Sequence, residues 1–321
     1  MANPLVSIVI LNWNGDGIVQ ECLSSVYETE YSDIEIIVVD NGSADGSRAW
    51  LRRQRKITLV ENERNEGFAR GTNIGFSRVR GVYAVALNND MVVEPSWLNE
   101  PVRRLEQDAR VGIVACRQMM YHDRATVDVL YHILARDLSF FPYGRAKQFS
   151  SMPGADKAGY ILSASGGSAV YRKKMLDEIG GFDERFFAYS EDADLSMRAF
   201  LSGWKCLYVP EAVAYHRGSA SFGRVPEKVT FYGQRNRYLL MYKYFPVSLI
   251  LAHLPWILNS ERRSMQQICL GQKSPGRYFS ILKGILCEQK NYKFLRKSNI
   301  ELFRQKRGEF LSLLEKRITL L

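Results

Sequence analysis

The chain has 321 residues, of which 46% are hydrophobic and 12% aromatic, and its formal net charge is +10. This composition is ample for a hydrophobic core, so we expect a folded globular protein and not a disordered one. The longest apolar stretch, residues 245–258, contains two prolines, a serine and a histidine, so we expect no membrane-spanning helix.

The N-terminal residues carry no basic segment, and their apolar run has the length of a strand, which does not resemble an export signal. Five cysteines are scattered along the chain without a C-x-x-C pair, which indicates reduced structural thiols. We therefore expect a cytoplasmic location. The cysteines are Cys22, Cys116, Cys206, Cys269 and Cys287.

The positive charge belongs to the C-terminal third of the chain. Residues 224–321 hold 19 Lys and Arg against 6 Asp and Glu, whereas residues 1–223 are slightly acidic. Basic charge beside an apolar stretch that is too short to span a bilayer favours contact with an anionic membrane surface at the inner face of the cell membrane. Basic tails also bind nucleic acid, but we expect no nucleic-acid partner here.

Short apolar runs rich in β-branched residues predict buried strands in the first part of the chain. They alternate with two predicted helices, residues 19–27 and 43–53, which indicates an α/β fold with an open, mostly parallel sheet covered on both faces. The predicted strands are residues 5–11, 34–39, 57–60 and 82–87.

Beyond about residue 230 the pattern changes to amphipathic helices, among them residues 232–244 and 300–320. We therefore predict two domains, a sheet-containing domain over residues 1–223 and a basic helical extension over residues 224–321. A membrane contact, an ordinary helical subdomain and a homo-oligomer contact are alternative roles for the extension.

Each predicted strand ends in polar residues, namely Asn12, Asp40-Asn41, Glu61-Asn62 and Asn88-Asn89-Asp90. Ligands of such sheets bind beyond the carboxyl ends of the strands, so these residues predict one polar crevice. The segment after the first strand lacks the third glycine of G-x-G-x-x-G, which argues against a dinucleotide-dependent dehydrogenase.

The segment Glu191-Asp192-Ala193-Asp194 places three carboxylates at the start of a helical pattern. Ionised carboxylates are poor core residues unless they are paired, so at least one is expected in a cleft as a proton acceptor or cation ligand. Glu191 and Asp192 are the first candidates for catalysis.

The other candidates each have a structural alternative. Asp40 suits a nucleobase or ribose contact but equally a helix N-cap. The Asn65–Arg70 loop suits phosphate oxygens but also a simple turn. Asp90 suits a divalent cation bound with diphosphate oxygens, although aspartates are common in turns. His216 ends a strand-like segment, where a lone histidine is often structural, and we assign structural roles to His122, His132 and His253.

Seven segments in this chain form an ordered set: Ser7–Asn14, Val38–Ser47, Asn65–Ala69, Leu87–Asp90, Gly180–Asp183, Glu191–Leu195 and Gly203-Trp204. Taken together, they resemble the family 2 glycosyltransferases with the A-type fold, and most closely their rhamnosyltransferase-like branch. The resemblance covers about residues 5–220.

The resemblance implies a nucleotide-sugar donor linked to UDP or dTDP, a bound Mg²⁺ or Mn²⁺, and inversion at the anomeric carbon. Asp192 resembles the general base, with Glu191 beside it. Asp90 resembles the metal-binding aspartate of the D-x-D position, and His216 the histidine that completes the metal site. The residues expected around the donor are Asn12, Asp40, Asn41, Asn65, Gly67, Arg70, Asn88 and Asn89.

Two residues depart from the family pattern. The D-x-D position is Asn88-Asn89-Asp90 and lacks its first carboxylate, and Arg70 stands where relatives often have glycine. We expect transfer of a sugar, rhamnose as the first hypothesis, to a saccharide or polyprenyl-linked acceptor in cell-surface polysaccharide synthesis. The alternatives are a non-catalytic nucleotide-sugar or glycan binding protein of this fold and a nucleotidyltransferase acting on sugar phosphates.

Overall fold

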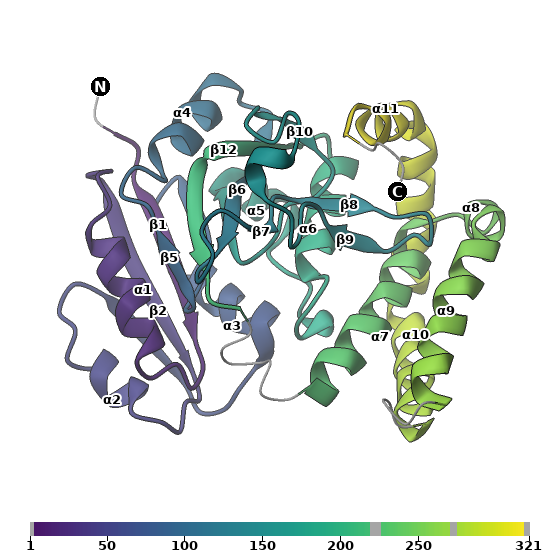
Figure 1. Cartoon of the computed structure of the whole chain (residues 1–321), viewed down its shortest axis with the longest axis horizontal. Coiled ribbons are helices and arrows are strands. Elements are labelled where there is room, and N and C mark those ends of the chain that lie inside the picture. The colour runs from purple at the N-terminus through teal and green to yellow at the C-terminus, as the bar shows by residue number, and fades with distance from the viewer. Residues whose placement is uncertain (1–2, 219–225, 270–274, 318–321) are drawn as a thin grey trace. The chain divides into compact units, whose positions relative to one another are not determined.

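The computed structural model describes residues 3–218, 226–269 and 275–317. A ten-stranded sheet has the main strand order β10-β12-β6-β11-β4-β1-β2-β3, with β5 paired to β12 and β7 paired to β6. Figure 1 shows part of this sheet, with β1, β2, β6 and β12 labelled. Strands β8 and β9 form a separate two-stranded sheet. The strands are β1 (Val6–Asn12), β2 (Ile34–Asn41), β3 (Thr58–Asn62), β4 (Tyr83–Asn88), β5 (Met91–Val93), β6 (Val111–Met120), β7 (Val127–Val129), β8 (His132–Leu134), β9 (Phe140–Pro142), β10 (Gly159–Ile161), β11 (Ser168–Arg172) and β12 (Lys205–His216).

The four predicted strands are confirmed as β1 to β4. β1 pairs in parallel with β2 and β4, and β2 pairs in parallel with β3. β11 lies antiparallel between β4 and β6, and β12 pairs in parallel with β6. The predicted α/β class with a mostly parallel central sheet is therefore confirmed, and the polar ends of β1, β2 and β4 meet at one edge because these strands run in the same direction.

Helices accompany this sheet, and α3 packs closely on β1. A Cβ atom on Gly75 would lie 2.2 Å from Val9 Cγ1 and one on Gly71 would lie 2.6 Å from Leu11 Cδ1, so two glycines let α3 pack on β1. The helices of this part are α1 (Ile18–Tyr27), α2 (Ser47–Leu51), α3 (Gly67–Phe76), α4 (Asn99–Gln107), α5 (Lys173–Ile179) and α6 (Glu191–Leu201), with short 3-10 turns at Phe149–Ser151 and Glu184–Phe186.

The predicted helix over residues 43–53 is too long. The Ser43 backbone N–H donates to Asp40 Oδ1 and the Ser47 N–H donates to Asp45 Oδ1, so the chain forms side-chain-capped turns before α2 begins at Ser47. Aspartate side chains compete for backbone donors in this way, which delays helix formation. The polar loop after β2 is correspondingly longer than predicted.

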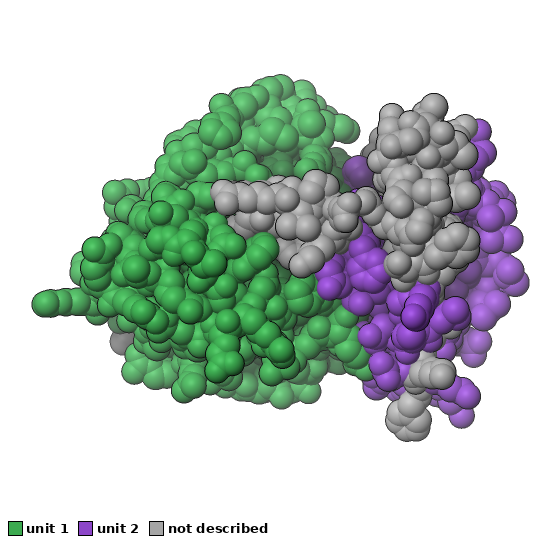
Figure 2. All heavy atoms as spheres, turned by 90° about the horizontal axis from the view of Figure 1, so that it is seen from below, with its two compact units in different colours: residues 1–132, 142–187, 191–224 green, residues 133–141, 188–190, 225–321 purple. Residues whose placement is uncertain are grey.

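The contacts of the chain divide it into two compact units, coloured separately in Figure 2. The first comprises residues 1–132, 142–187 and 191–224, and the second residues 133–141, 188–190 and 225–321. The proposed boundary between residues 223 and 224 stays a prediction, since the second unit also includes two short earlier segments. Its helices are α7 (Pro226–Tyr244), α8 (Val247–Ala252), α9 (Leu254–Cys269), α10 (Pro275–Gln305) and α11 (Arg307–Arg317).

Within the second unit, the predicted helix over residues 232–244 lies inside α7. The predicted helix over residues 300–320 is divided at Lys306 between α10 and α11, and the rings of Phe303 and Phe310 contact each other with centroids 4.8 Å apart. Residues 318–320 of that prediction lie outside the described residues. None of the helices within the described ranges is both long and apolar enough to cross a bilayer.

Candidate active site

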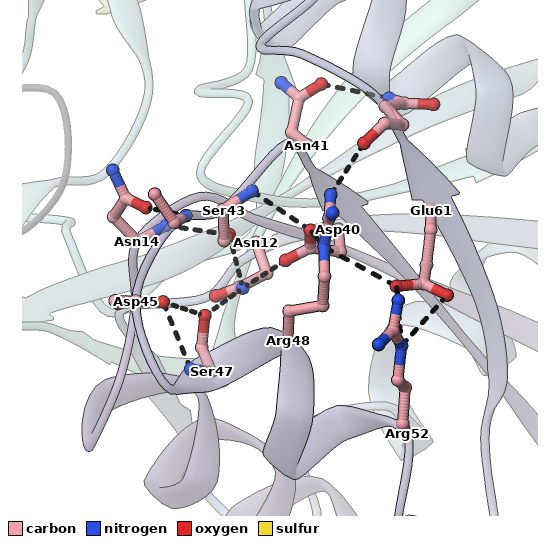
Figure 3. Close-up of polar contacts among 12 residues, drawn as sticks. Asn12, Asn14, Asp40, Asn41, Ser43, Asp45, Ser47, Arg48, Arg52 and Glu61 are labelled. Carbon is pink, nitrogen blue, oxygen red and sulfur yellow. Dashed lines mark hydrogen bonds and ion pairs between the residues drawn. The ribbon is translucent and has the colours of Figure 1, made fainter.

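A buried hydrogen-bond network joins the ends of β1 and β2 (Figure 3). The Asn12 side-chain amide lies 3.0 Å from Asp40 Oδ2 and 3.0 Å from Ser47 Oγ, and its oxygen accepts from Asn89 at 2.9 Å. Arg48 Nε donates to Asp40 Oδ1 at 2.7 Å. Asn12 therefore connects three strand-end segments through its own side chain.

The Asp40 carboxylate is completely buried but ionised. Burial raises its pKa, whereas hydrogen bonds from Ser43, Arg48 and Asn12 lower it, and these bonds prevail to hold the pKa below its usual value. Asp40 accepts the Ser43 N–H at 3.1 Å in the turn before α2, but it does not cap that helix, whose N-cap is Gly46, so the helix-cap alternative is wrong. Ligand contact by Asp40 stays a prediction.

Asn41 holds the glycine-containing loop that follows β3. Its amide donates to Asn65 Oδ1 and to the Gly67 carbonyl, both at 3.1 Å. Its oxygen accepts from Asn62 Nδ2 at 2.9 Å and from the Glu66 N–H at 3.0 Å. The side chain of Asn41 therefore makes four hydrogen bonds inside the protein, and it fixes the loop geometry.

Gly67 and Arg70 both lie in the first turn of α3, so the loop predicted over Asn65–Arg70 ends before Gly67. The two residues differ in exposure. Gly67 has φ +85°, and a Cβ atom there would lie 2.6 Å from the Phe187 ring and 2.7 Å from the Phe187 carbonyl oxygen, so only glycine fits. The Arg70 side chain is 54% exposed and its Nε lies 3.5 Å from Glu66 Oε2. Arg70 is therefore accessible to a ligand.

Asp90 and His216 lie together with a residue that the sequence analysis did not single out. His216 Nε2 is 3.3 Å from Asp90 Oδ2, and His216 Nδ1 is 2.7 Å from Asp128 Oδ2. Burial lowers the pKa of His216, but hydrogen bonds to Asp128 and Asp90 outweigh it and raise that pKa to about 10. Asp128 precedes His216 by 88 residues, and no local spacing pattern connects them.

The turn at Gly166-Gly167 brings Asp192 beside the end of β4. The Gly166 N–H donates to Asp192 Oδ2 at 2.8 Å, and the Gly167 carbonyl accepts from the Asn88 N–H at 2.9 Å. A Cβ on Gly167 would lie 2.8 Å from Met91 Cε, so this close approach requires a small residue. The same turn therefore positions the predicted base and the Asn88–Asp90 segment.

The predicted pair Glu191 and Asp192 begins α6. Asp192 accepts from the backbone N–H groups of Gly166 and Ala193, whereas the Glu191 side chain is buried. Burial, and next the charge of Asp192, raise the pKa of Glu191 well above its usual value, which favours the protonated form of Glu191 beside the oriented Asp192 side chain. Asp194 is buried and pairs with Arg198 at 2.9 Å, which gives it a structural role.

Two buried polar atoms near Asp192 are left without a hydrogen bond among the described residues, Glu191 Oε2 and His132 Nδ1. His132 Nδ1 lies 3.8 Å from Asp192 Oδ2, beyond hydrogen-bond distance. His132 was expected to be structural, and the sequence offers no signal that it approaches the acidic pair. Unpaired buried polar atoms are rare in native proteins and are a feature of sites that receive ligands.

The residues at the Asp90 position fit a divalent cation. A carboxylate oxygen and an imidazole nitrogen converge there, and Asp128 binds the second nitrogen of the same imidazole. In the described part of the chain, no group of three or more His, Cys, Asp or Glu side chains forms a complete metal site. Two protein ligands suit an ion whose other ligands are diphosphate oxygens and water.

Comparisons with known proteins give the family. The sequence model of glycosyl transferase family 2 matches residues 7–180. An uncharacterized glycosyltransferase of Haemophilus influenzae is 30% identical over 112 residues, which are 34% of this chain and 35% of that protein. The N-acetylglucosaminyl-diphospho-decaprenol L-rhamnosyltransferase of Mycobacterium tuberculosis is 23% identical over 248 residues, which are 69% of this chain and 79% of that enzyme.

Solved structures show the same fold. The mannosyltransferase PcManGT from Pyrobaculum calidifontis, solved in complex with GDP-Man and Mn²⁺, has a TM-score of 0.57 at 16% identity over 95% of this chain and 87% of that one. The expected A-type fold and the expected similarity to rhamnosyltransferases are therefore confirmed. Because the family model covers more than half of the residues, the chain belongs to glycosyl transferase family 2.

Proposed function

We propose that the protein is an inverting, metal-dependent glycosyltransferase that moves a sugar, rhamnose as the first candidate, from a UDP- or dTDP-linked donor to a saccharide acceptor. The observation that carries this proposal is the turn at Gly166-Gly167, which holds the Asp192 carboxylate and the Asn88–Asp90 segment side by side. Displacement at a sugar carbon needs a base and a leaving-group site next to each other.

Asp192 is the proposed general base. Its two oxygens accept from backbone N–H groups, so the carboxylate is oriented, and Glu191 beside it is protonated and does not compete for a proton. The acceptor oxygen attacks the anomeric carbon while its proton passes to Asp192. The bond from that carbon to the diphosphate oxygen breaks, and the nucleoside diphosphate leaves with the electron pair. Attack from the opposite face inverts the configuration.

Asp90 and His216 are the proposed holders of Mg²⁺ or Mn²⁺. A bound cation supplies charge neutralisation for the diphosphate leaving group. The chain's own contribution is to bring Asp90 Oδ2 and His216 Nε2 to 3.3 Å of each other. The Mn²⁺ in the PcManGT structure, a relative in fold, supports this assignment.

The proposed donor-binding residues differ in how accessible their side chains are to a ligand. Asn12, Asp40 and Asn41 are buried and hydrogen-bonded within the protein, so we propose that their main contribution is to fix the loops around the donor. Asn65 and Gly67 shape the same loop, Asn88 ends β4 and bonds the Gly167 carbonyl, and Asn89 bonds Asn12. Arg70 is exposed and is the proposed contact to the donor's charged groups.

The acceptor is proposed to be lipid-linked and to serve polysaccharide synthesis. The similar Mycobacterium enzyme is named for a decaprenol-linked acceptor, which supports this class. In the helical unit, α8 and α9 expose several large apolar side chains, and the exposed Arg262 and Arg263 follow on α9. A surface of this kind suits the interface of an anionic membrane. The apolar residues are Val247, Leu251, Leu254, Trp256 and Leu258.

The test follows release of nucleoside diphosphate from UDP-, dTDP- and GDP-sugars with Mn²⁺ or Mg²⁺, using saccharide and polyprenyl-linked acceptors. We expect release from one donor, lost in Asp192→Asn while donor binding persists. Asp177→Asn, an exposed carboxylate of α5 paired with Lys173, is the matched control and should keep full activity. Donor binding without release from any donor and acceptor pair would favour a non-catalytic binding protein.

A further inference from the structure

Asp128 makes the closest contact to His216, although it belongs to a different part of the sheet. It is the central residue of β7, between Val127 and Val129, which are both buried in the core. Because strand side chains alternate, Asp128 points to the face opposite these two valines. A carboxylate in this position is only 15% exposed, and it is bonded to the His216 ring at 2.7 Å.

The sheet brings Asp128, His216 and Asp90 together through four strands. β7 pairs with β6, β6 pairs with β12, and β5 pairs with the end of β12, where His216 lies opposite Met91. Asp90 directly precedes β5. The imidazole of His216 therefore lies between two carboxylates, with Nδ1 at 2.7 Å from Asp128 and Nε2 at 3.3 Å from Asp90.

The two nitrogens of the His216 ring have different partners, Asp128 at Nδ1 and Asp90 at Nε2. Protonated His216 has a hydrogen on each ring nitrogen. A cation bound at Nε2 would take the place of the hydrogen beside Asp90, and the Nδ1–H would still donate to Asp128. Carboxylates that accept from the second nitrogen of a metal-bound histidine fix its tautomer and ring orientation and raise its basicity. Such partners typically change metal affinity by about 10- to 100-fold.

We propose that Asp128 is a positioning residue that holds His216 in the tautomer and orientation needed to bind a divalent cation together with Asp90. This inference rests on the proposed metal-dependent function. The short bond is on Nδ1, away from the proposed cation, and the longer separation is at Nε2, on the side of Asp90.

The first test measures Mn²⁺ affinity in the presence of UDP or dTDP from the electron paramagnetic resonance signal of free Mn²⁺. We expect Asp128→Asn and Asp128→Ala to weaken Mn²⁺ binding by about 10- to 100-fold. Asp123→Asn is the matched control, because its carboxylate lies on the same segment but bonds Thr126. This control should stay within about two-fold of the wild-type protein.

The second test uses the wild-type protein, so it does not depend on whether the Asp128 variants fold. Nitrogen-15 NMR of the histidine-labelled wild-type protein with Mg²⁺ and UDP, assigned with His216→Gln, reports which ring nitrogen carries hydrogen. A proton on Nδ1 supports the inference and a proton on Nε2 overturns it. Unchanged Mn²⁺ affinity in folded Asp128 variants also overturns it, while leaving the proposed function intact. If the wild-type protein binds no Mn²⁺, the metal-dependent function itself fails.

Discussion

The two sides of the candidate site satisfy their polar groups very differently. At the ends of β1 and β2, Asn41 makes four hydrogen bonds within the protein, and the buried Asp40 accepts from Arg48, Ser43 and Asn12. Near the start of α6, Glu191 Oε2 and His132 Nδ1 are buried but lack a hydrogen bond among the described residues.

The side chains at the ends of β1 and β2 therefore form a hydrogen-bonded scaffold, whereas buried polar atoms near the start of α6 lack partners among the described residues. A buried polar atom without a partner costs about 1–3 kcal/mol, so such atoms persist where another requirement holds them in place. On the proposed donor side the side chains of Asn12, Asp40 and Asn41 fix backbone loops and are hydrogen-bonded within the fold. On the side of Asp192 the polar groups stay unpaired beside the proposed acceptor position, where a substrate hydroxyl would complete them.

The largest expected effect is on kcat, and it distinguishes the two neighbouring carboxyl groups Asp192 and Glu191. Asp192→Asn should lower kcat by about 10²- to 10⁴-fold, the usual contribution of a general base. Glu191→Gln should keep kcat within about 10-fold, because glutamine has the shape of the protonated acid and the raised pKa makes Glu191 neutral already. Steady-state kinetics with a saturating donor would measure both, and a larger loss in Glu191→Gln would reverse the assignment of the base.

The scaffold side predicts a large effect on stability. Asn41→Ala removes four hydrogen bonds, one of them buried and three partly buried, and leaves their backbone and side-chain partners unpaired, so the free energy of unfolding should fall by about 2–4 kcal/mol. Urea denaturation followed by circular dichroism would measure it. Asn3→Ala, at an exposed asparagine bonded to Ser32, is the control and should cost less than about 0.5 kcal/mol. Equal losses in the two variants would contradict a structural role for Asn41.

Glu191 also predicts how stability depends on pH. Its pKa is raised in the folded protein, so its contribution is fully present below the usual value of 4.5 and is lost as pH rises through the folded pKa. Glu191→Gln removes this titration, so the variant should become more stable relative to the wild-type protein as pH rises from 5 to 8. The gain has an upper limit of about 1.4 kcal/mol per pH unit. A constant difference in unfolding free energy across this range would show that Glu191 is ionised when folded.

Local patterns predicted the scaffold side well and the other contacts poorly. The four strands, their polar ends and the position of Glu191-Asp192 follow from apolar runs and from acidic residues at a helix start, which are features of neighbouring residues. The contacts of Asp128 with His216 and of His132 with Asp192 join residues 88 and 60 positions apart. They depend on the pairing of β7 with β6 and on the path of the turn at Gly166, and neither has a pattern within a short window of sequence.

The smallest expected effect is on donor affinity, and it compares two exposed arginines, Arg64 and Arg70. The comparison tests whether Arg70 contacts the donor. Arg64 and Arg70 both contact Glu66 and are 80% and 54% exposed, so replacing either by alanine should change the free energy of unfolding by less than about 0.5 kcal/mol. If Arg70 contacts the donor, Arg70→Ala should weaken binding of the nucleotide-sugar by about 10-fold, as expected for a hydrogen bond to a charged group, and Arg64→Ala should not. Isothermal titration calorimetry with UDP- and dTDP-sugars distinguishes the two. Equal affinities in both variants would leave donor contact to the backbone of the Asn65–Gly67 loop, because Asn12, Asp40 and Asn41 are already hydrogen-bonded within the protein.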